Sequence, residues 1–201
     1  MILNEDEFPE HNMAKLIKGA VVPRAIAWVS SIDKDGMPNL APFSFFTVAS
    51  MDPITLCFSA GPGNNESGFK DTVANIKETG EFVVNIVSED MANKMYESSK
   101  NYDPEEDEFA RADIASAPSE LVRAPRVSDS PVNMECTLDR IVEVGASRLI
   151  LGRVICYHLK DEIEMDSDKV DPHKLKPVGR MAGDYTYVRD FYKLPNPDLK
   201  D

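Results

Sequence analysis

The pattern that most constrains the fold is a short polar turn between two stretches of strand-forming residues. Residues 25–32 are mostly β-branched, aromatic or small, and the Asp-Lys-Asp-Gly sequence at 33–36 interrupts them before a second such stretch begins near Met37. An Asp-Gly pair in this setting is one of the strongest short-range signals of a β-hairpin. We therefore expect antiparallel strands in this part of the chain.

Strand-like composition returns along the rest of the chain. Further strands are predicted at residues 43–49, 54–60, 81–87, 132–144 and 148–160. Strands and helices do not alternate regularly, which argues against a doubly wound parallel sheet. The pattern favours one domain over residues 1–201, mostly β with short helices, built as an antiparallel barrel with helical insertions.

Two short helices are expected between the strands. The first is predicted to begin at Asp71 as its N-cap, to run to Glu78 and to stop at Gly80, because Asp and Gly are favoured at those two ends. The second is predicted to be capped by Ser88 and to run to about residue 101, with a further helical piece near residue 109.

Charge and cysteine usage limit the classes of partner and the compartment. The chain has 35 acidic and 22 basic residues, a formal net charge of −13, and a field of that sign repels nucleic acids and anionic membranes. No apolar stretch approaches the roughly 18–20 residues that span a bilayer, and the first ten residues lack a signal-peptide pattern. Three cysteines without a CxxC pair indicate reduced thiols. We expect a cytoplasmic protein that binds neither nucleic acid nor membrane.

The sequence contains no motif for metal binding or nucleophilic catalysis. His11, His158 and His173 are scattered along the chain, without a second ligand at metal spacing, so no metal site is expected. His158 is interpreted as a hydrogen-bonded structural residue in a strand. Neither a Gly-x-Ser-x-Gly elbow nor a Walker lysine loop occurs. No catalytic side chain is predicted.

Four segments in order resemble one known protein family. They are residues 23–31 (Pro-Arg-Ala-Ile-Ala-Trp-Val-Ser-Ser), 39–46 (Asn-Leu-Ala-Pro-Phe-Ser-Phe-Phe), 70–76 (Lys-Asp-Thr-Val-Ala-Asn-Ile) and 81–85 (Glu-Phe-Val-Val-Asn). Together they resemble the flavin-reductase-like FMN-binding family, which includes NAD(P)H:flavin reductases and flavoredoxin-like electron carriers. The resemblance implies an antiparallel split β-barrel that binds FMN.

The helix expected near residue 71 is a candidate site for the FMN phosphate. A helix N-terminus offers unpaired N–H groups and the positive end of the helix dipole. Lys70 adds a full positive charge, the Thr72 hydroxyl can donate, and Asn75 lies one turn further along, on the side of Asp71 or Thr72. The alternative interpretation is an ordinary capped surface helix with a solvated lysine.

The segment before it is a candidate site for the flavin ring. A proline removes one donor and fixes φ, which leaves neighbouring backbone groups free to face a ligand. By resemblance, the residues that line or approach the ring are Ser30, Ala41, Pro42, Phe43, Ser44 and Thr47. The alternative is a core strand with an edge proline.

The C-terminal part also resembles the family, with one departure. Residues 180–185 resemble its Arg-x-Gly-Gly-x-x-Tyr segment, but Ala182 stands where the family favours glycine. Arg180 is a candidate contact to flavin or to a nicotinamide phosphate, or else part of a structural ion pair. The tail from Pro172 onward carries prolines and aromatic residues and is expected to be irregular, covering a groove or a neighbouring subunit.

These observations favour an FMN-binding oxidoreductase that takes a hydride from NADH or NADPH. Flavin carries this chemistry itself, so a missing protein acid or base is no objection. Two alternatives remain open. One is a flavoredoxin-like electron carrier that docks another redox protein and has no nicotinamide site. The other is a non-redox dimeric scaffold. The resemblance further implies a homodimer with flavin in a groove between subunits.

Overall fold

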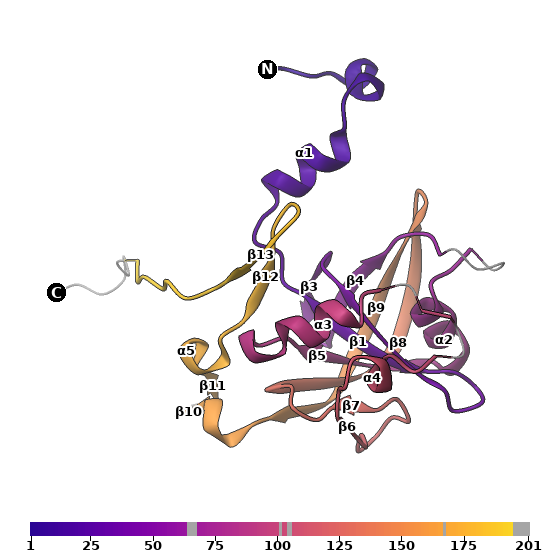
Figure 1. Ribbon diagram of the computed structural model, residues 1–201, viewed down its shortest axis with the longest axis vertical. Coiled ribbons are helices and arrows are strands. Elements are labelled where there is room, and N and C mark those ends of the chain that lie inside the picture. The colour runs from indigo at the N-terminus through magenta and orange to yellow at the C-terminus, as the bar shows by residue number, and fades with distance from the viewer. Residues whose placement is uncertain (64–67, 101, 104–105, 167, 195–201) are drawn as a thin grey trace.

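A seven-stranded antiparallel sheet dominates the computed structural model, which describes residues 1–63, 68–100, 102–103, 106–166 and 168–194 (Figure 1). Its strands are β1 (Ala27–Ile32), β2 (Pro38–Phe43), β3 (Phe46–Met51), β4 (Ile54–Ala60), β5 (Glu81–Ile86), β8 (Val132–Val144) and β9 (Ser147–Leu159). Their order is β2-β1-β5-β8-β9-β4-β3. The edge strands β2 and β3 follow each other in the chain, and β2 also contacts β4. The sheet therefore curls toward closure, which confirms the predicted split barrel.

The first hairpin forms as the turn sequence predicts. The carboxylate of Asp33 accepts hydrogen bonds from the backbone N–H of Asp35 at 2.9 Å and of Met37 at 2.8 Å. Gly36 has φ +95°, a conformation that favours glycine. The local turn chemistry thus sets the register in which Ala27 pairs with Phe43.

Aromatic side chains fill the barrel interior. The ring centroids of Phe43 and Phe58 lie 4.8 Å apart, and those of Phe58 and Phe82 lie 5.8 Å apart. Helix α2 (Asp71–Thr79) adds buried Val73 and Ile76 to the same core. Two register shifts in the β8–β9 pair bend these long strands, as bulges do where a sheet curves.

The outer face of β1 and β2 carries a second core under short helices. The remaining helical segments are η1 (Glu5–Glu10), α1 (Met13–Ala20), η2 (Glu89–Met91), α3 (Ala92–Glu97), α4 (Glu108–Arg111), η3 (Asp161–Ile163) and α5 (Pro172–Leu175). Fully buried Trp28 packs there with Met95 of α3 and Phe109 of α4, and its Nε1 donates to Ser98 Oγ at 2.9 Å. Trp28 is therefore a core residue.

Three small two-stranded sheets complete the fold. They pair β6 (Ser116–Ala117) with β7 (Arg126–Val127), β10 (Glu164–Met165) with β11 (Lys169–Val170), and β12 (Val178–Arg180) with β13 (Tyr185–Tyr187). The predicted irregular tail is wrong for residues 178–187. Arg24 and Arg180 exchange backbone hydrogen bonds of 3.0 and 2.8 Å, which attach the β12–β13 hairpin to the segment that precedes β1.

Two helix predictions need correction. The N-cap of α2 is Lys70 rather than Asp71, and Gly80 ends the helix in the left-handed conformation as expected. The helix predicted after Ser88 is shorter, because a 3₁₀ turn, η2, precedes α3 and α3 ends at Glu97. Its expected end, residue 101, lies outside the described residues.

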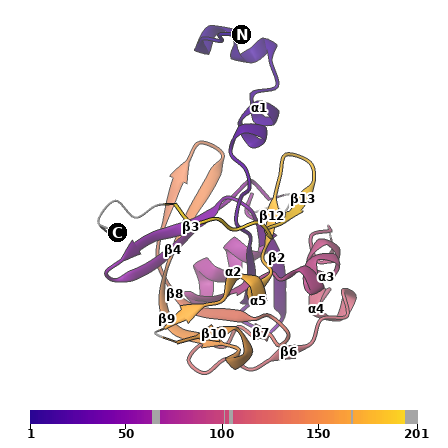
Figure 2. The same cartoon turned by 90° about the vertical axis from the view of Figure 1, so that its left-hand side faces the viewer.

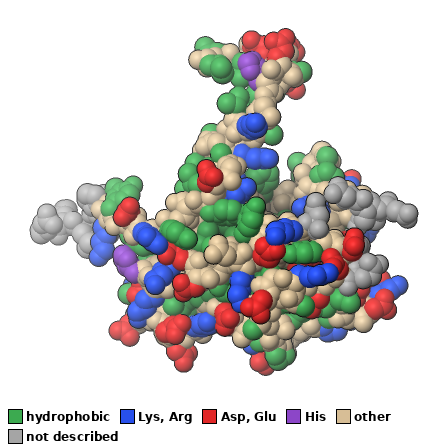
Figure 3. Space-filling model, viewed as in Figure 1, with side chains coloured by type: hydrophobic (Ala, Val, Ile, Leu, Met, Phe, Trp, Pro, Cys, Tyr) green, Lys and Arg blue, Asp and Glu red, His purple; other side chains and the backbone are tan. Residues whose placement is uncertain are grey.

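The N-terminal segment forms an arm that stands away from the barrel (Figures 1 and 2). Neither η1 nor α1 contains a buried residue, and Figure 3 shows hydrophobic side chains along the arm and at its base. Leu16 and Ile17 of α1 are 46% and 56% exposed. Across the described residues, each helix is too short or too polar to cross a membrane.

Candidate functional site

A groove of about 490 Å³ lies where the N-terminal arm meets the turn between β2 and β3. Ile17, Lys18 and Val21 line one side, and residues 44–47 line the other, with Pro23–Ala25 between them. The volume falls within the roughly 300–1,000 Å³ typical of small-molecule sites. The structure thus brings the predicted ring-site residues Ser44 and Thr47 together in one concave surface.

Arg24 supports the wall of this groove. Its Nη1 donates to the carbonyls of Lys18 at 2.7 Å and Val21 at 2.8 Å, and its Nη2 donates to the carbonyl of Met181 at 2.7 Å. These bonds satisfy carbonyls at the end of α1, where a cation is favoured. Arg24, which lies just before β1, therefore connects the N-terminal arm with the C-terminal hairpin.

One donor of Arg24 stays unsatisfied. Among the described residues, the buried Arg24 Nε has no hydrogen-bond acceptor, and the guanidinium carbon lies 5.7 Å from the ring centroid of Phe45. A buried unpaired donor costs free energy unless a ligand or water completes it. Arg24 also lines the groove, so a ligand bound there would lie beside a guanidinium with unused donor capacity, which suits a ligand with an acceptor atom.

The predicted ring-lining segment at 41–43 is divided between two faces of β2. Ala41 and Phe43 pack on the barrel core, whereas Pro42 pairs with Trp28 and, by strand alternation, faces the other side. Lys70 Nζ lies 5.6 Å from the centroid of the Phe43 ring. Phe43 thus connects the ring-site segment with the start of α2.

At α2, the side chains predicted to meet a phosphate have partners within the fold. Thr72 is buried and its hydroxyl donates to Asn39 Oδ1 at 2.6 Å. Asn75 Nδ2 donates to Ser31 Oγ at 3.2 Å. The Val73 and Ala74 N–H groups donate to the Lys70 carbonyl. The exposed Lys70 ammonium is consequently the feature of this helix start that suits an anion best.

The opposite side of the same helix start is acidic. Asp71 and Asn75 line a hollow of about 100 Å³ together with Asp33, Asp103, Glu106 and Glu108. Burial raises the pKa of the Glu108 carboxyl, although hydrogen bonds from its own backbone, from Leu40 N–H and from the Asn39 side chain oppose the rise. Negative charge on this side disfavours a phosphate. Asp71 and Asn75 therefore lie on the acidic side of the helix start.

Two further predicted residues lie elsewhere. Ser30 is fully buried, and its hydroxyl donates to the Pro125 carbonyl at 2.5 Å. It faces the outer side of β1, while Ser31 faces Asn75. Arg180 Nη1 donates to the carbonyls of Gly183 and Asp184, and its guanidinium covers the Tyr185 ring at 4.4 Å. Arg180 stabilises its own hairpin, and within the part of the chain that the structure describes it forms no ion pair of the kind predicted as its alternative role.

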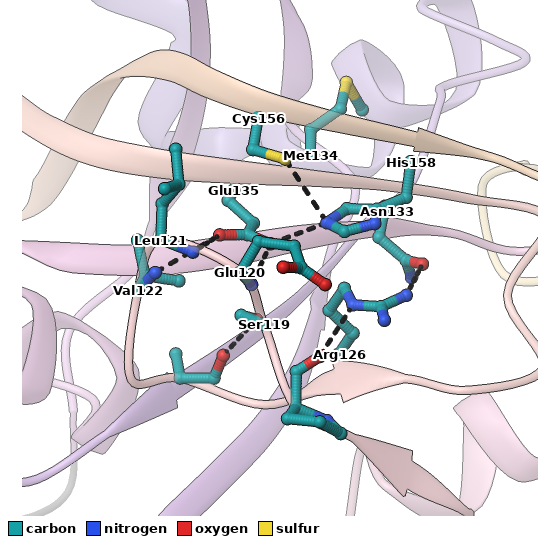
Figure 4. A network of polar contacts seen from close by, with 12 residues as sticks. Ser119, Glu120, Leu121, Val122, Arg126, Asn133, Met134, Glu135, Cys156 and His158 are labelled. Carbon is teal, nitrogen blue, oxygen red and sulfur yellow. Dashed lines mark hydrogen bonds and ion pairs between the residues drawn. The ribbon is translucent and has the colours of Figure 1, made fainter.

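A separate polar network lies on the outer face of β8 and β9 (Figure 4). His158 Nε2 is 2.6 Å from Glu135 Oε1 and 3.5 Å from Cys156 Sγ. Burial raises the pKa of the Glu135 carboxyl, but donors from the Glu120 backbone, His158 and the Leu121 backbone outweigh it, so the pKa is lowered. Both neighbours approach the same imidazole nitrogen, so the group cannot work as a nucleophile–base–carboxylate relay.

Sequence reasoning missed the N-terminal arm as part of the groove. The signal was present: Asn12 accepts a capping bond from Lys15 N–H, and Met13, Leu16, Ile17 and Ala20 recur at helical spacing. The expectations from sequence contain no helix in this segment.

Comparison with known proteins gives matches along the whole chain. The sequence model of the family described as "Flavin reductase like domain" matches residues 19–176. An uncharacterized protein of Aquifex aeolicus is 41% identical over 177 residues, covering 88% of this chain and 89% of that protein.

Two solved structures extend the comparison. Nitrilotriacetate monooxygenase component B from Bacillus cereus has a TM-score of 0.91 at 31% identity, covering 96% of this chain and 98% of that chain. The 2-nitrobenzoate 2-nitroreductase of Pseudomonas fluorescens has a TM-score of 0.86 at 27% identity, covering 100% and 98%.

Proposed function

This chain belongs to the flavin reductase like family, and from that premise we propose that it is an FMN-binding oxidoreductase that uses NADH or NADPH. The groove at residues 44–47 carries the proposal, because it joins a suitable volume to a buried donor that lacks a partner. The reductase and monooxygenase-component names of the two similar structures support redox chemistry for this fold.

In this proposal the flavin ring lies in the groove and the phosphate lies toward Lys70. Ser44 and Thr47 contribute hydroxyl groups to the groove, and the Arg24 guanidinium lies beside the ring edge. The Lys70 ammonium, beside the Phe43 ring, meets the phosphate at the positive end of α2. The acidic hollow on the other side of the helix start directs an anion toward Lys70.

The residues of this chain bind and orient the flavin. The flavin, when bound, would accept the hydride and pass it on. Arg24 is held by three carbonyl acceptors, so its guanidinium is fixed in direction before a ligand arrives. Such preorganised donors cost little reorganisation when charge develops on a ligand. Phe45 and Phe46 provide apolar walls, which limit the access of water to the ring.

The proposed functional unit is a homodimer. Leu16 and Ile17 on the arm and Val48, Met51 and Ile54 on β3–β4 are all large, apolar and exposed. Exposed apolar surface of this extent, together with an arm that buries nothing, marks a protein interface. A second copy packed here would close the groove and exclude water from it. The three free cysteines are consistent with a cytoplasmic location.

The first experiment is the visible spectrum of the purified protein, with FMN added if it is colourless, followed by anaerobic addition of NADH or NADPH. Bleaching of the flavin absorbance within seconds is the expected result. Bleaching by dithionite but by neither nucleotide would favour the electron carrier. A protein that does not bind FMN at all would favour the scaffold and end the proposal.

The dimer is tested by sedimentation equilibrium of the variant Ile17→Glu. A buried charge at the interface should produce monomers and weaken FMN binding. Leu121→Glu is the matched control, because Leu121 is also exposed, at 62%, but lies far along the chain in the 119–122 loop. A dimeric, flavin-loaded Ile17→Glu variant would refute this interface.

A further inference from the structure

Three side chains with metal-ligating atoms meet on the outer face of β8 and β9, in the network described above (Figure 4). They are Glu135, Cys156 and His158, and one ligand atom from each lies within 4.8 Å of the others. In the strand register Glu135 is opposite Cys156, and His158 follows two residues later. Strand alternation therefore directs all three to the same face.

The separations are close to those of a tetrahedral zinc site. Zinc bonds of about 2.3 Å to sulfur and about 2.0 Å to imidazole nitrogen place those two atoms about 3.5 Å apart. The observed separation of Cys156 Sγ and His158 Nε2 is 3.5 Å. The 2.6 Å between His158 Nε2 and Glu135 Oε1 is a hydrogen-bond distance. A rotation that opens it by less than about 1 Å would admit the ion.

The carboxylate is already oriented by donors behind it. Glu135 Oε1 accepts from Glu120 N–H at 2.8 Å, and Oε2 accepts from Leu121 N–H at 2.7 Å and Val122 N–H at 3.2 Å. Hydrogen bonds to a ligating carboxylate are a regular part of metal sites and raise their affinity. Glu135 is fully buried, whereas Cys156 and His158 are half-buried. An ion can therefore enter from the side of the thiol and imidazole.

Local charge also favours a cation. Burial, and then the carboxylates of Glu135 and Glu120, raise the pKa of the Cys156 thiol. Arg126 acts on the thiol in the opposite direction, but its guanidinium is held by the Pro118 carbonyl at 3.1 Å and by Asn133 Oδ1 at 3.3 Å. A divalent cation would relieve the repulsion between a thiolate and these carboxylates.

We propose that Glu135, Cys156 and His158 bind one Zn²⁺ ion, with the fourth position open to water. Carboxylate, thiolate and neutral imidazole together form a ligand set that suits zinc among the common divalent ions. On binding, the Cys156 thiol releases its proton to solvent as the zinc–sulfur bond forms, and no electrons are exchanged. The ion would fasten the 119–122 loop to the barrel through Glu135. The site is independent of the flavin groove.

Co²⁺ is the probe, because its thiolate complexes absorb in the near ultraviolet and its tetrahedral complexes absorb strongly in the visible. Metal-free, reduced, full-length protein is titrated with Co²⁺ and then with Zn²⁺. Any bound flavin is removed first, so that its absorbance does not mask the cobalt bands. One equivalent of Co²⁺ should produce the thiolate band, and Zn²⁺ should remove it. Cys156→Ser should abolish the band, and His158→Gln should weaken binding by at least about tenfold.

Two variants serve as controls for residue type. Cys57→Ser removes a cysteine that is also partly exposed, and His173→Gln removes a histidine outside the cluster. Both should keep the Co²⁺ band and its stoichiometry. Circular dichroism verifies that Cys156→Ser and His158→Gln are folded. No thiolate band in the wild-type protein, or a band that survives Cys156→Ser, would overturn the proposal, as would binding only at millimolar metal.

Discussion

Thr72 Oγ1 donates a hydrogen bond of 2.6 Å to Asn39 Oδ1, and this bond joins the first turn of α2 to the edge strand β2. Both side chains are buried, and Asn39 Nδ2 donates in turn to Glu108 Oε1 at 2.6 Å. Helix α2, strand β2 and helix α4 therefore share one chain of hydrogen bonds. The Thr72 hydroxyl, a predicted phosphate donor, therefore has a structural role.

Replacing Thr72 with valine should destabilise the protein without changing its selectivity between FMN and riboflavin. The variant leaves Asn39 Oδ1 with only the long 3.4 Å bond from Ser31, which should cost about 1–3 kcal/mol in the free energy of unfolding. Urea unfolding measures the loss. Thr72→Ser keeps the hydroxyl and is the control. An unchanged unfolding free energy would show that the bond contributes nothing.

Replacing Lys70 with alanine should weaken FMN binding much more than riboflavin binding. Losing a charge-assisted contact of about 1.5–3 kcal/mol corresponds to an FMN affinity at least tenfold weaker. Riboflavin has no phosphate, so its affinity does not depend on this contact. Fluorescence titration measures both affinities. Lys77→Ala, in the same helix and beside the Phe69 ring, is the matched control. Equal losses for the two ligands would mean that the phosphate does not lie at Lys70.

The hairpins of the barrel could be predicted because their signals are local. The turn at residues 33–36 is determined by its own residues, because the Asp33 side chain accepts a hydrogen bond within the turn and Gly36 adopts a positive φ. The same holds for the β4 strand, whose bounds agree with the prediction. The C-terminal hairpin depends on non-local contacts instead. It is held by backbone bonds to Arg24, which nothing near residue 180 reveals.

The functional residues were harder to predict because strand faces depend on register. Ser30 and Ser31 are neighbours in sequence, yet one contacts Pro125 outside the sheet and the other contacts Asn75 of α2. Glu135 and His158 come together only because β8 pairs with β9. Cys156 and His158 are only two residues apart, but the third side chain of the group comes from the neighbouring strand, so spacing along the chain does not reveal it.

Gly152 should not tolerate even one added methyl group. A Cβ at this position would lie 2.2 Å from Cζ of Phe82, in the middle of the aromatic core. Gly152→Ala should therefore lower the unfolding free energy by about 1–3 kcal/mol, the usual cost of overpacking. Gly183→Ala, where the added atom meets nothing within 4 Å, should have little effect. Partial rescue by Phe82→Leu in the Gly152→Ala background would identify the clash as the cause, and no rescue would contradict it.

The Glu108 carboxylate lies at the end of the hydrogen-bond chain that starts at Thr72. Its two oxygens accept from Asn39 Nδ2 at 2.6 Å and from Leu40 N–H at 3.0 Å. Burial nevertheless dominates and raises its pKa. The folded protein therefore holds a proton on Glu108 at a pH where the unfolded chain, with a glutamate pKa of about 4.3, has lost it.

This difference fixes the direction of one contribution to stability. Lowering the pH from neutral toward about 4.3 should stabilise the folded state through Glu108, because over that interval the folded state binds more protons than the unfolded state. Glu108→Gln cannot titrate. The unfolding free energy of the wild-type protein minus that of Glu108→Gln should therefore rise as the pH falls, since all other carboxyl groups cancel in the difference. Urea unfolding at several pH values measures it. A difference that is constant, or that falls on acidification, would mean that the carboxylate is not penalised by its burial.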